Sequence, residues 1–346
     1  MKVLRFLLFP FAIIYDIITA IRNFLFEKDI LKSVKFSLPV IVVGNLSVGG
    51  TGKTPQVEYL VRILQGKFKV AILSRGYGRK TKGYILANIN HSASDIGDEP
   101  LQYYKKFANI NVAVNENRVE GIQQLIQSKS PDIILLDDAY QHRKVKGSCY
   151  VLLTKYSDLF IDDFLLPTGN LRENRAGAAR ADVIVVTKCP SNLSILEQDK
   201  IKKKLQLFNK PVFFSTIAYA DKISGSLNLT IDALKSKHLL LVTGIANPKP
   251  LLSFLSDNAI NFTHLNYPDH HHFTDKNIQD IISKFSEINS KDKLILTTEK
   301  DYTRLQNKIT ELSYLEIRTA FLNNDASNFN SLILNSIGVN LYNLNN

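Results

Sequence analysis

An apolar run that leads into a glycine-rich loop and then a helical pattern most constrains how this chain folds. The run at 39–43 reads Pro-Val-Ile-Val-Val, the β-branched composition of a buried parallel strand. Residues 44–55 follow as Gly-Asn-Leu-Ser-Val-Gly-Gly-Thr-Gly-Lys-Thr-Pro, and apolar residues then recur at helical spacing up to Leu64. In this order, backbone N–H groups and a helix N-terminus can surround phosphate oxygens. The sequence therefore predicts a P-loop nucleotide site, with an ordinary strand-to-helix turn as the alternative.

The loop pattern also assigns roles to its own residues. Lys53 is expected to bridge the β- and γ-phosphates of the nucleotide, and Thr54 to bind Mg²⁺. Ser47 stands where the strict eight-residue pattern begins with glycine. Val48 stands where partition and targeting ATPases have an extra lysine, which disfavours that group. The predicted nucleotide-binding residues are Ser47, Val48, Gly49, Gly50, Thr51, Gly52, Lys53 and Thr54.

A second apolar run, 131–136, is followed by the paired aspartates Asp137 and Asp138. The carboxyl ends of parallel strands face the ligand crevice, so both carboxylates are expected beside the P-loop. One of them would hold Mg²⁺ directly or through water, and the other could bind the water molecules or side chains around the metal. A turn or a helix cap is the alternative for two such aspartates.

The nucleotide is predicted to be ATP. Residues 187–190 read Thr-Lys-Cys-Pro, which resembles the guanine-reading Thr/Asn-Lys-x-Asp motif of GTPases, but Pro190 stands where the aspartate is required. The only cysteines, Cys149 and Cys189, form no Cys-x-x-Cys pair. They therefore suggest neither a disulfide framework nor a thiolate metal site.

Several further motifs follow one another along the chain. They are Leu-Ser-Arg-Gly-Tyr-Gly-Arg at 73–79, Gly-Asp-Glu-Pro at 97–100, Asp-Asp-Ala-Tyr-Gln-His at 137–142, Leu-Pro-Thr-Gly-Asn-Leu-Arg-Glu at 166–173, Thr-Gly-Ile-Ala-Asn-Pro at 243–248, Asp-His-His at 269–271 and Thr-Glu-Lys-Asp at 298–301. Their order resembles that of the tetraacyldisaccharide 4'-kinases, the lipid A 4'-kinases of Gram-negative bacteria, over roughly residues 40–305. Ala139 and Tyr140 depart from the Gly-Phe that this family typically has.

The resemblance implies an ATP-dependent lipid kinase. Its reaction would transfer the γ-phosphoryl group of ATP to the 4'-hydroxyl of tetraacyldisaccharide 1-phosphate. The product would be lipid IVA, made for lipopolysaccharide at the cytoplasmic face of the bacterial inner membrane. The alternative from another class is a regulatory P-loop NTPase that switches the binding of a protein partner and needs no base for an acceptor hydroxyl.

The resemblance also implies roles for residues outside the P-loop. Asp98 is the candidate base for the sugar hydroxyl, and His270 matches the position thought to orient it; an Asx turn is the alternative for Asp98. Arg172 would stabilise the transferred phosphoryl charge and Glu173 would serve the metal or the hydroxyl, with a surface ion pair as the alternative. The residues placed around the substrate by analogy are Ser74, Arg75, Tyr77, Arg79, Glu99, Arg118, Gln141 and His142.

The N-terminal segment 4–21 is strongly apolar, although it includes Arg5, Pro10 and Asp16, and basic residues follow it. A helix lying in the membrane interface fits this pattern, because its apolar side would enter the acyl boundary while the basic flank meets anionic headgroups. A spanning helix, which would bear the cost of Asp16, a cleaved signal peptide and a buried core helix are the alternatives. The formal net charge of +11 suits an anionic lipid, and nucleic acid is disfavoured because no nucleic-acid-binding motif accompanies the charge.

Strand-like runs alternate with helical stretches along the chain, which predicts an α/β fold. We expect a P-loop NTPase-like α/β/α domain, a second, smaller α/β domain and an N-terminal membrane-associated helix. The expected boundaries are 1–38 for the helical segment, 39–215 for the P-loop domain and 216–346 for the smaller domain, with a hinge near 210–225. Closure about that hinge would bring Asp98 and His270 together.

Overall fold

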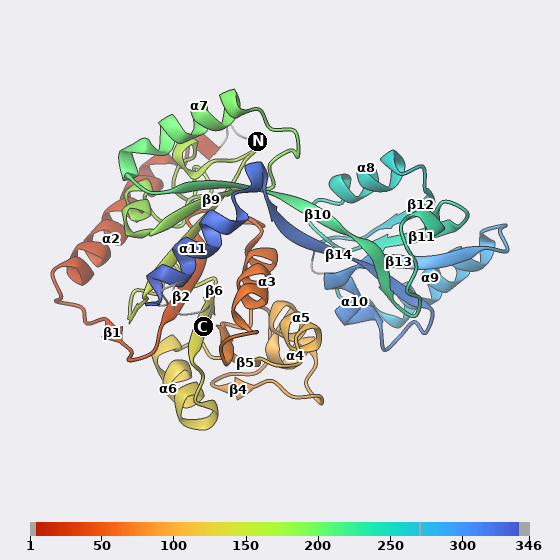
Figure 1. Ribbon diagram of the computed structural model, residues 1–346, viewed down its shortest axis with the longest axis horizontal. Helices are drawn as coiled ribbons and strands as arrows, with labels where there is room; N and C mark the ends of the chain where they lie inside the picture. The colour runs from red at the N-terminus through yellow and green to blue at the C-terminus, as the bar shows by residue number, and fades with distance from the viewer. Residues whose placement is uncertain (1–4, 270, 339–346) are drawn as a thin grey trace.

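The computed structural model describes residues 5–269 and 271–338 and consists of two α/β units joined by two long strands (Figure 1). Within these residues, a twelve-stranded sheet runs through both units in the order β12-β11-β13-β14-β10-β9-β8-β2-β6-β3-β5-β4. A separate pair is formed by β1 (Val34–Lys35) and β7 (Val145–Lys146). The α/β fold class predicted from the sequence is confirmed.

The larger unit contains the P-loop and a mainly parallel part of the sheet. Its strands are β2 (Val40–Asn45), β3 (Val70–Ser74), β4 (Ile85–Leu86), β5 (Asn111–Val114), β6 (Ile133–Asp137), β8 (Cys149–Lys155) and β9 (Val183–Thr187). Only β4 pairs antiparallel among them. The helices are α3 (Lys53–Leu64), α4 (Ala93–Ile96), α5 (Asp98–Lys106), α6 (Arg118–Lys129), α7 (Ile195–Leu205) and α11 (Ala326–Ser336), with short 3₁₀ turns η1 (Phe160–Asp162), η2 (Arg175–Arg180) and η3 (Gln206–Phe208).

Both faces of this part of the sheet are covered, because side chains of each strand alternate between two cores. On β2, Ile41 and Val43 pack in the core that contains α3, α5 and α11, whereas Val40 and Val42 pack in the core that contains α6. A parallel strand that is buried on both faces needs apolar residues at successive positions. This requirement explains why β2 reads as a continuous apolar run rather than an alternating one.

The smaller unit repeats this plan around a second parallel sheet. Its strands are β11 (His238–Thr243), β12 (Asn261–Asn266) and β13 (Lys293–Thr298), extended by the first residues of β14 (Leu312–Phe321). Helix α8 (Lys249–Asp257) packs in one core, and α9 (Asp275–Glu287) and α10 (Glu299–Leu305) pack in the other. The 3₁₀ turn η4 (Asp232–Leu234) lies before β11.

Two long antiparallel strands connect the units. The first residues of β10 (Val212–Gly225) pair with β9 in the larger unit, and β10 then pairs with β14 from Ser215 opposite Phe321 to Gly225 opposite Ser313. Because β14 runs back along β10, it returns the chain through η5 (Leu322–Asn324) to the larger unit. Helix α11 accordingly packs there, with Phe329 and Ile333 in the α3 core. The sequence-based boundaries placed all of 216–346 in the smaller unit and did not anticipate this return.

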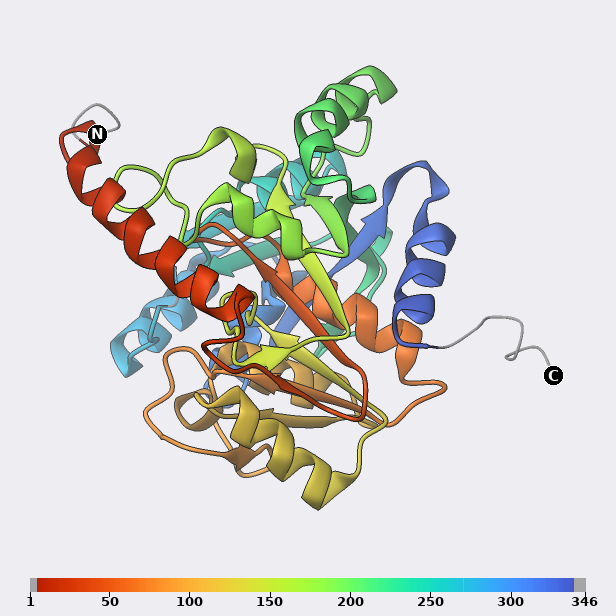
Figure 2. The ribbon, with the colours of Figure 1, turned by 90° about the vertical axis from the view of Figure 1, so that its left-hand side faces the viewer.

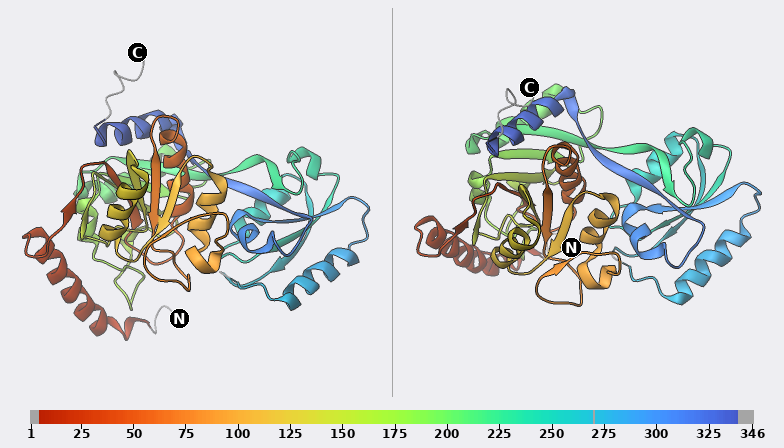
Figure 3. Two further views of the ribbon diagram at one scale, coloured as in Figure 1. Left: turned by 90° about the horizontal axis from the view of Figure 1, so that it is seen from below. Right: turned by 60° about the horizontal axis from the view of Figure 1, so that its bottom comes forward.

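Helix α2 (Phe9–Glu27) lies along the outside of the larger unit, on the side opposite α11 (Figures 2 and 3). It is, within the described residues, the one helix long and apolar enough to cross a membrane by length and composition. Only Ala12 and Phe26 of this helix are buried. The alternative of a buried core helix therefore does not describe α2.

Candidate active site

The P-loop lies between β2 and α3, as the sequence predicts. Gly52 precedes α3 in a left-handed conformation with φ of 84°, which glycine adopts without a Cβ penalty. Lys53 is the first residue of α3, and its Nζ lies 3.5 Å from Asp138 Oδ1 and 3.5 Å from Asn45 Oδ1. The positive end of the α3 dipole and the Lys53 ammonium thus point at one region, where an anionic group would be stabilised.

The end of β9 supports this loop from the side. Thr187 donates from Oγ1 to the Thr51 carbonyl at 2.7 Å, and Lys188 donates from Nζ to the Gly50 carbonyl at 2.8 Å. Lys188 has a positive φ of 57°, and burial lowers its pKa, as do the charges of Lys155 and Lys53 nearby. The segment that resembles a guanine-reading motif therefore contacts the backbone of the phosphate loop.

Asp137 and Asp138 both lie beside the P-loop at the carboxyl end of β6. Asp137 is 5% exposed, and its Oδ2 accepts a hydrogen bond from Ser74 at 3.3 Å. Burial, then the charges of Asp138 and Glu99, raise the pKa of Asp137 to about 7. Its Oδ1 is buried and has no hydrogen-bond partner among the described residues. A buried carboxylate oxygen without a partner, next to a second carboxylate, is a feature that a divalent cation would satisfy.

The segment 166–173 runs along the P-loop and is fixed to it by its backbone. Val48 donates from its N–H to the Asn170 carbonyl at 2.7 Å, and Arg172 donates from its N–H to the Leu46 carbonyl at 2.7 Å. The Arg172 guanidinium lies 3.4 Å from Asp138 Oδ2. Arg172 therefore joins Lys53 at the same carboxylate.

Glu173 has a different position from the one expected for a metal or hydroxyl ligand. Its oxygens accept from Arg180 Nη1 at 2.6 Å and Nη2 at 2.9 Å, and Asn23 and Gln141 also donate to it. Glu173 is 3% exposed. Because both oxygens bind the Arg180 guanidinium, Glu173 anchors the 166–173 segment to η2 and α2 in this structure, and its role at the metal or the hydroxyl stays a prediction.

Three of the residues placed around the substrate by analogy are Ser74 at the end of β3 and Arg118 at the start of α6, which are buried, and His142 after β6, which is half-buried. Arg118 is 3% exposed and donates to the backbone carbonyl of Asn115; burial lowers its pKa to about 10 despite the nearby aspartates. Burial, then the charges of Arg118 and Lys144, lower the pKa of His142 to about 4. Ser74 donates to the Asp137 carboxylate, and Arg118 Nη2 donates to the Asp137 carbonyl at 3.5 Å.

The remaining residues of that group lie further out. Gln141 donates from its amide to the Asn45 carbonyl at 2.8 Å, which places it beside the P-loop strand. Arg75 and Tyr77 are exposed, whereas Arg79 is paired with Glu116 at 2.7 Å. Arg79 is therefore bound to the segment that follows β5.

Asp98 and Glu99 are the first two residues of α5. Gly97 has φ of 92°, and a Cβ there would lie 3.1 Å from the Gly76 backbone. This close approach fixes the start of α5 against the 73–79 segment. His270, the expected partner of Asp98, lies outside the described residues.

Sequence reasoning missed a set of contacts between α2 and the site. Tyr15 donates from its hydroxyl to the Arg172 carbonyl at 2.7 Å, and Asn174 donates from Nδ2 to the Asp16 carboxylate at 2.9 and 3.0 Å. Asn23 donates to Glu173 Oε1 at 2.8 Å. The polar residues 15, 16, 19 and 23 recur at helical spacing, a signal that marks one face of α2 as protein-facing.

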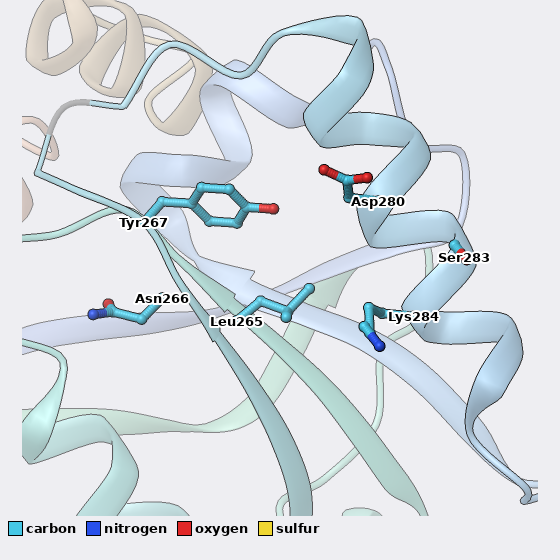
Figure 4. A pocket seen from close by; sticks show the side chains of 6 residues that line it. All are labelled: Leu265, Asn266, Tyr267, Asp280, Ser283 and Lys284. Carbon is cyan, nitrogen blue, oxygen red and sulfur yellow. The ribbon is translucent and has the colours of Figure 1, made fainter.

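A separate groove of about 410 Å³ lies in the smaller unit between the end of β12 and α9 (Figure 4). Its lining residues are Leu265, Asn266, Tyr267, Asp280, Ser283 and Lys284. None of them belongs to the P-loop or to the aspartates of β6. We assign the chemistry to the P-loop because the convergent charged groups lie there.

Comparison with known proteins gives the same assignment along the whole chain. The family model for tetraacyldisaccharide-1-P 4'-kinase matches residues 4–338. The chain is 52% identical over 346 residues to the tetraacyldisaccharide 4'-kinase of Flavobacterium johnsoniae, covering 99% of each protein. It is 54% identical over 344 residues to the enzyme of Flavobacterium psychrophilum, covering 97% of this chain and 98% of that one.

A solved structure agrees with the fold as well. The crystal structure described as the "apo" form of LpxK from Aquifex aeolicus in complex with ATP matches with a TM-score of 0.78 and 30% sequence identity. The match covers 96% of this chain and 99% of that one. Both units and the strands between them are therefore common to the two proteins.

Proposed function

Since the chain belongs to the tetraacyldisaccharide 4'-kinase family, the ATP-dependent kinases of lipid A biosynthesis, we propose that the site around Lys53 carries this reaction. The γ-phosphoryl group of ATP would pass to the 4'-hydroxyl of a tetraacyldisaccharide 1-phosphate. The observation that carries the proposal is the convergence of Lys53 and Arg172 on Asp138 at the N-terminus of α3. Such positive groups can neutralise a phosphoryl group during transfer.

Each residue has a distinct part in this proposal. The backbone of residues 47–52 and Lys53 bind the β- and γ-phosphates, and Arg172 stabilises the charge of the transferred group. Asp98 accepts the proton of the attacking hydroxyl. The reaction breaks the bond between the γ-phosphorus and the β–γ bridging oxygen, leaves ADP, and forms a phosphate ester on the sugar oxygen. These roles are supported by the contacts of Lys53 and Arg172 with Asp138 and by the position of Asp98 at the start of α5.

Mg²⁺ fits the donor set of the site. Thr54 in the first turn of α3 and the carboxylates of Asp137 and Asp138 are the residues that would hold it, together with phosphate oxygens. The unpartnered Asp137 Oδ1 and the raised pKa of its carboxyl support this assignment. When bound, the cation would neutralise charge on the β- and γ-phosphates.

The membrane surface is proposed as the place where the acceptor is met. Exposed apolar side chains recur along α2 at helical spacing, namely Phe11, Ile14, Ile18 and Ile21. The opposite face holds the 166–173 segment through Tyr15 and Asn23. A lipid with four acyl chains stays in the bilayer, so α2 would lie in the cytoplasmic interface of the inner membrane and bring the site to it.

Closure of the two units is also proposed, because β10 and β14 form a narrow connection between them. The register of this pair shifts between Tyr219 and Ile223, a point at which a strand pair can bend. A distance measured between labels on the two units should shorten when ATP and lipid are added. An unchanged distance would contradict closure.

The test of function uses labelled ATP and vesicles or micelles that contain the disaccharide 1-phosphate lipid. We expect the label on the lipid, with Lys53→Ala reducing transfer to background. Asp98→Asn should lower kcat while nucleotide affinity stays near that of the unsubstituted protein. Hydrolysis of ATP without any labelled lipid would instead favour a regulatory switch.

A further inference from the structure

The start of α5 is held by charged residues of α10, which belongs to the other unit (Figure 1). Arg304 donates from Nε to Asp98 Oδ1 at 2.9 Å and from Nη2 to Asp98 Oδ2. Lys300, about one turn earlier on α10, lies 3.6 Å from Glu99 Oε1. The Asp98 and Arg304 side chains are only 14% and 10% exposed. A bidentate arginine contact with a largely buried carboxylate fixes the orientation of that carboxylate and stabilises its charged form.

Arg304 is itself held in place from behind. Its Nη1 lies 3.4 Å from Asp301 Oδ1, and Asp301 is fully buried. Asp301 Oδ2 accepts from the Gly244 backbone N–H at 2.8 Å and from Thr298 Oγ1 at 2.7 Å. The Thr-Glu-Lys-Asp motif at 298–301 therefore fixes Arg304 to the turn after β11. As a result, the guanidinium is held in one orientation toward Asp98.

We propose that Arg304 is a positioning residue for the Asp98 carboxylate in the kinase reaction. A carboxylate has about four lone-pair sites, so a guanidinium that uses one on each oxygen leaves others to receive the hydroxyl proton. Arg304 holds the carboxylate ionised and turned toward the acceptor. Because Arg304 lies in the smaller unit, Asp98 reaches this orientation only while α10 is docked on α5. The inference rests on the proposed role of Asp98 as base.

The charge around Asp98 determines what the removal of Arg304 would change. Among the described residues, the charged groups near this pair are Glu99 on α5, Lys300 and Asp301 on α10, and Asp269 beside Lys300. A nearby cation lowers a carboxyl pKa by about one to three units. Removing the guanidinium takes away the cation that contacts Asp98 directly, while the carboxylates of Glu99 and Asp301 stay and Lys300 remains paired with Glu99, so the pKa of Asp98 should rise.

The experiment measures lipid phosphorylation against pH for Arg304→Gln and Arg304→Lys. Arg304→Gln should lower kcat by about 10- to 100-fold, since misplacement of a catalytic group costs rates of this size. On the acid side of its pH profile, the pH at which activity is half lost should rise by about one unit or more. Arg304→Lys keeps the positive charge but loses the bidentate contact. The acid side of its pH profile should therefore stay near that of the unsubstituted protein, and its kcat should fall less than that of Arg304→Gln.

A double-substitution cycle separates this role from a general loss of structure. In the Asp98→Asn background, Arg304→Gln should add no further loss of kcat, because the arginine acts through the carboxylate. Melting temperature and ATP affinity are measured for each variant, and Lys284→Gln, which removes an exposed ion pair with Glu287, serves as the control.

Two outcomes would overturn the inference. One is a kcat for Arg304→Gln equal to or above that of the unsubstituted protein, which would make the contact dispensable or inhibitory. The other is a loss of the same size with and without Asp98. If Asp98→Asn alone keeps full activity, the base assignment of the proposed function fails, whereas an inactive Asp98→Asn beside an unaffected Arg304→Gln refutes only the positioning role.

Discussion

Gly44 shows how closely the strand before the P-loop approaches the segment after β6. A Cβ built on Gly44 would lie 2.7 Å from the Cβ of Tyr140 and 3.0 Å from its backbone nitrogen. Tyr140 cannot move aside easily, because it is 1% exposed and its hydroxyl donates to the Gly177 carbonyl at 2.9 Å. The glycine is thus required by space and not by backbone conformation.

Gly44→Ala should therefore destabilise the protein by about 1–3 kcal/mol, the usual cost of overpacking a core. Denaturant unfolding followed by circular dichroism measures this loss. Gly66→Ala is the matched control, since a Cβ at Gly66 has nothing within 4 Å. Equal stability of the two variants would show that Tyr140 can move away from the added methyl group without a loss of folding free energy.

Asp16 explains how a charged residue is accommodated in an apolar helix. Its carboxylate accepts from Asn174 and so faces the protein, which removes the cost that a lipid-facing aspartate would carry. Its partner lies 158 residues away in sequence, so only the helical spacing of polar residues, and not the contact, could be predicted.

We expect Asp16→Ala to lower kcat while membrane binding stays unchanged or rises slightly. The substitution leaves the Asn174 amide without this acceptor, at a cost of about 1–3 kcal/mol, and loosens the segment that contains Arg172. Lipid phosphorylation in detergent micelles and sedimentation with vesicles measure the two effects separately. A parallel loss of both would mean that Asp16 serves only to keep α2 folded.

At the scale of elements, the sequence predicted the strands that contain ligand-facing residues but not the contacts between helices. The apolar runs at β2 and β6 are long and bounded by glycine or aspartate, so their type and order could be read directly. The positions of Lys53, Asp137 and Asp138 follow from that order alone. The Glu173–Arg180 pair and the docking of α10 on α5 depend on tertiary packing, which no local pattern encodes.

Helices α3, α5 and α10 and strand β14 meet at a group of charges centred on Lys106. Its Nζ lies 2.6 Å from Glu58 Oε2, 2.8 Å from Glu299 Oε2 and 2.9 Å from Glu316 Oε1. Burial and the neighbouring Glu58 raise the pKa of Glu299 to about 7. Lys106 thus holds carboxylates of both units together at the base of the helix that begins with Asp98.

Lys106→Met should destabilise the protein at pH 8 by about 3–5 kcal/mol, because it leaves the buried carboxylate of Glu299 without the cation that contacts it and leaves Glu58 with Arg62 as its cation. Burial and Glu58 raise the pKa of Glu299 to about 7 even beside Lys106, which lowers it, so the loss of Lys106 should raise this pKa further. At pH 6 Glu299 is then protonated in the folded variant, and the penalty should be smaller than at pH 8. Unfolding at pH 6 and pH 8 measures this difference.

Lys106→Met combined with Glu299→Gln should recover part of the lost stability at pH 8. The second substitution removes one of the uncompensated charges and keeps the size of the side chain. If the loss of stability does not change with pH, or if the double variant is no more stable than Lys106→Met, then the charge of Glu299 does not contribute to the destabilisation.

At the scale of the whole molecule, the apolar stripe of α2 and the net charge of +11 suit the same partner. Apolar burial and attraction to anionic lipid contribute separately to binding at an interface. Helix α2 lies along the outside of the larger unit and away from α11 (Figure 3), and its apolar side chains are exposed, so they can enter a bilayer surface without disturbing the core.

Replacing Ile14 and Ile18 by Gln should weaken binding to vesicles that contain anionic lipid. The two side chains are 55% and 60% exposed, and full burial of an isoleucine contributes about 1.5–3 kcal/mol, so the partition coefficient should fall by at least about tenfold. Phosphorylation of lipid in detergent micelles should stay close to that of the unsubstituted protein. Both side chains are exposed, and the contacts of α2 with the 166–173 segment are made by Tyr15 and Asn23. Raising the salt concentration should weaken binding of both proteins by a similar factor, since the substitutions leave the charge unchanged. If the double variant binds vesicles as tightly as the unsubstituted protein, α2 does not form the membrane contact, and the surface charge must account for it alone.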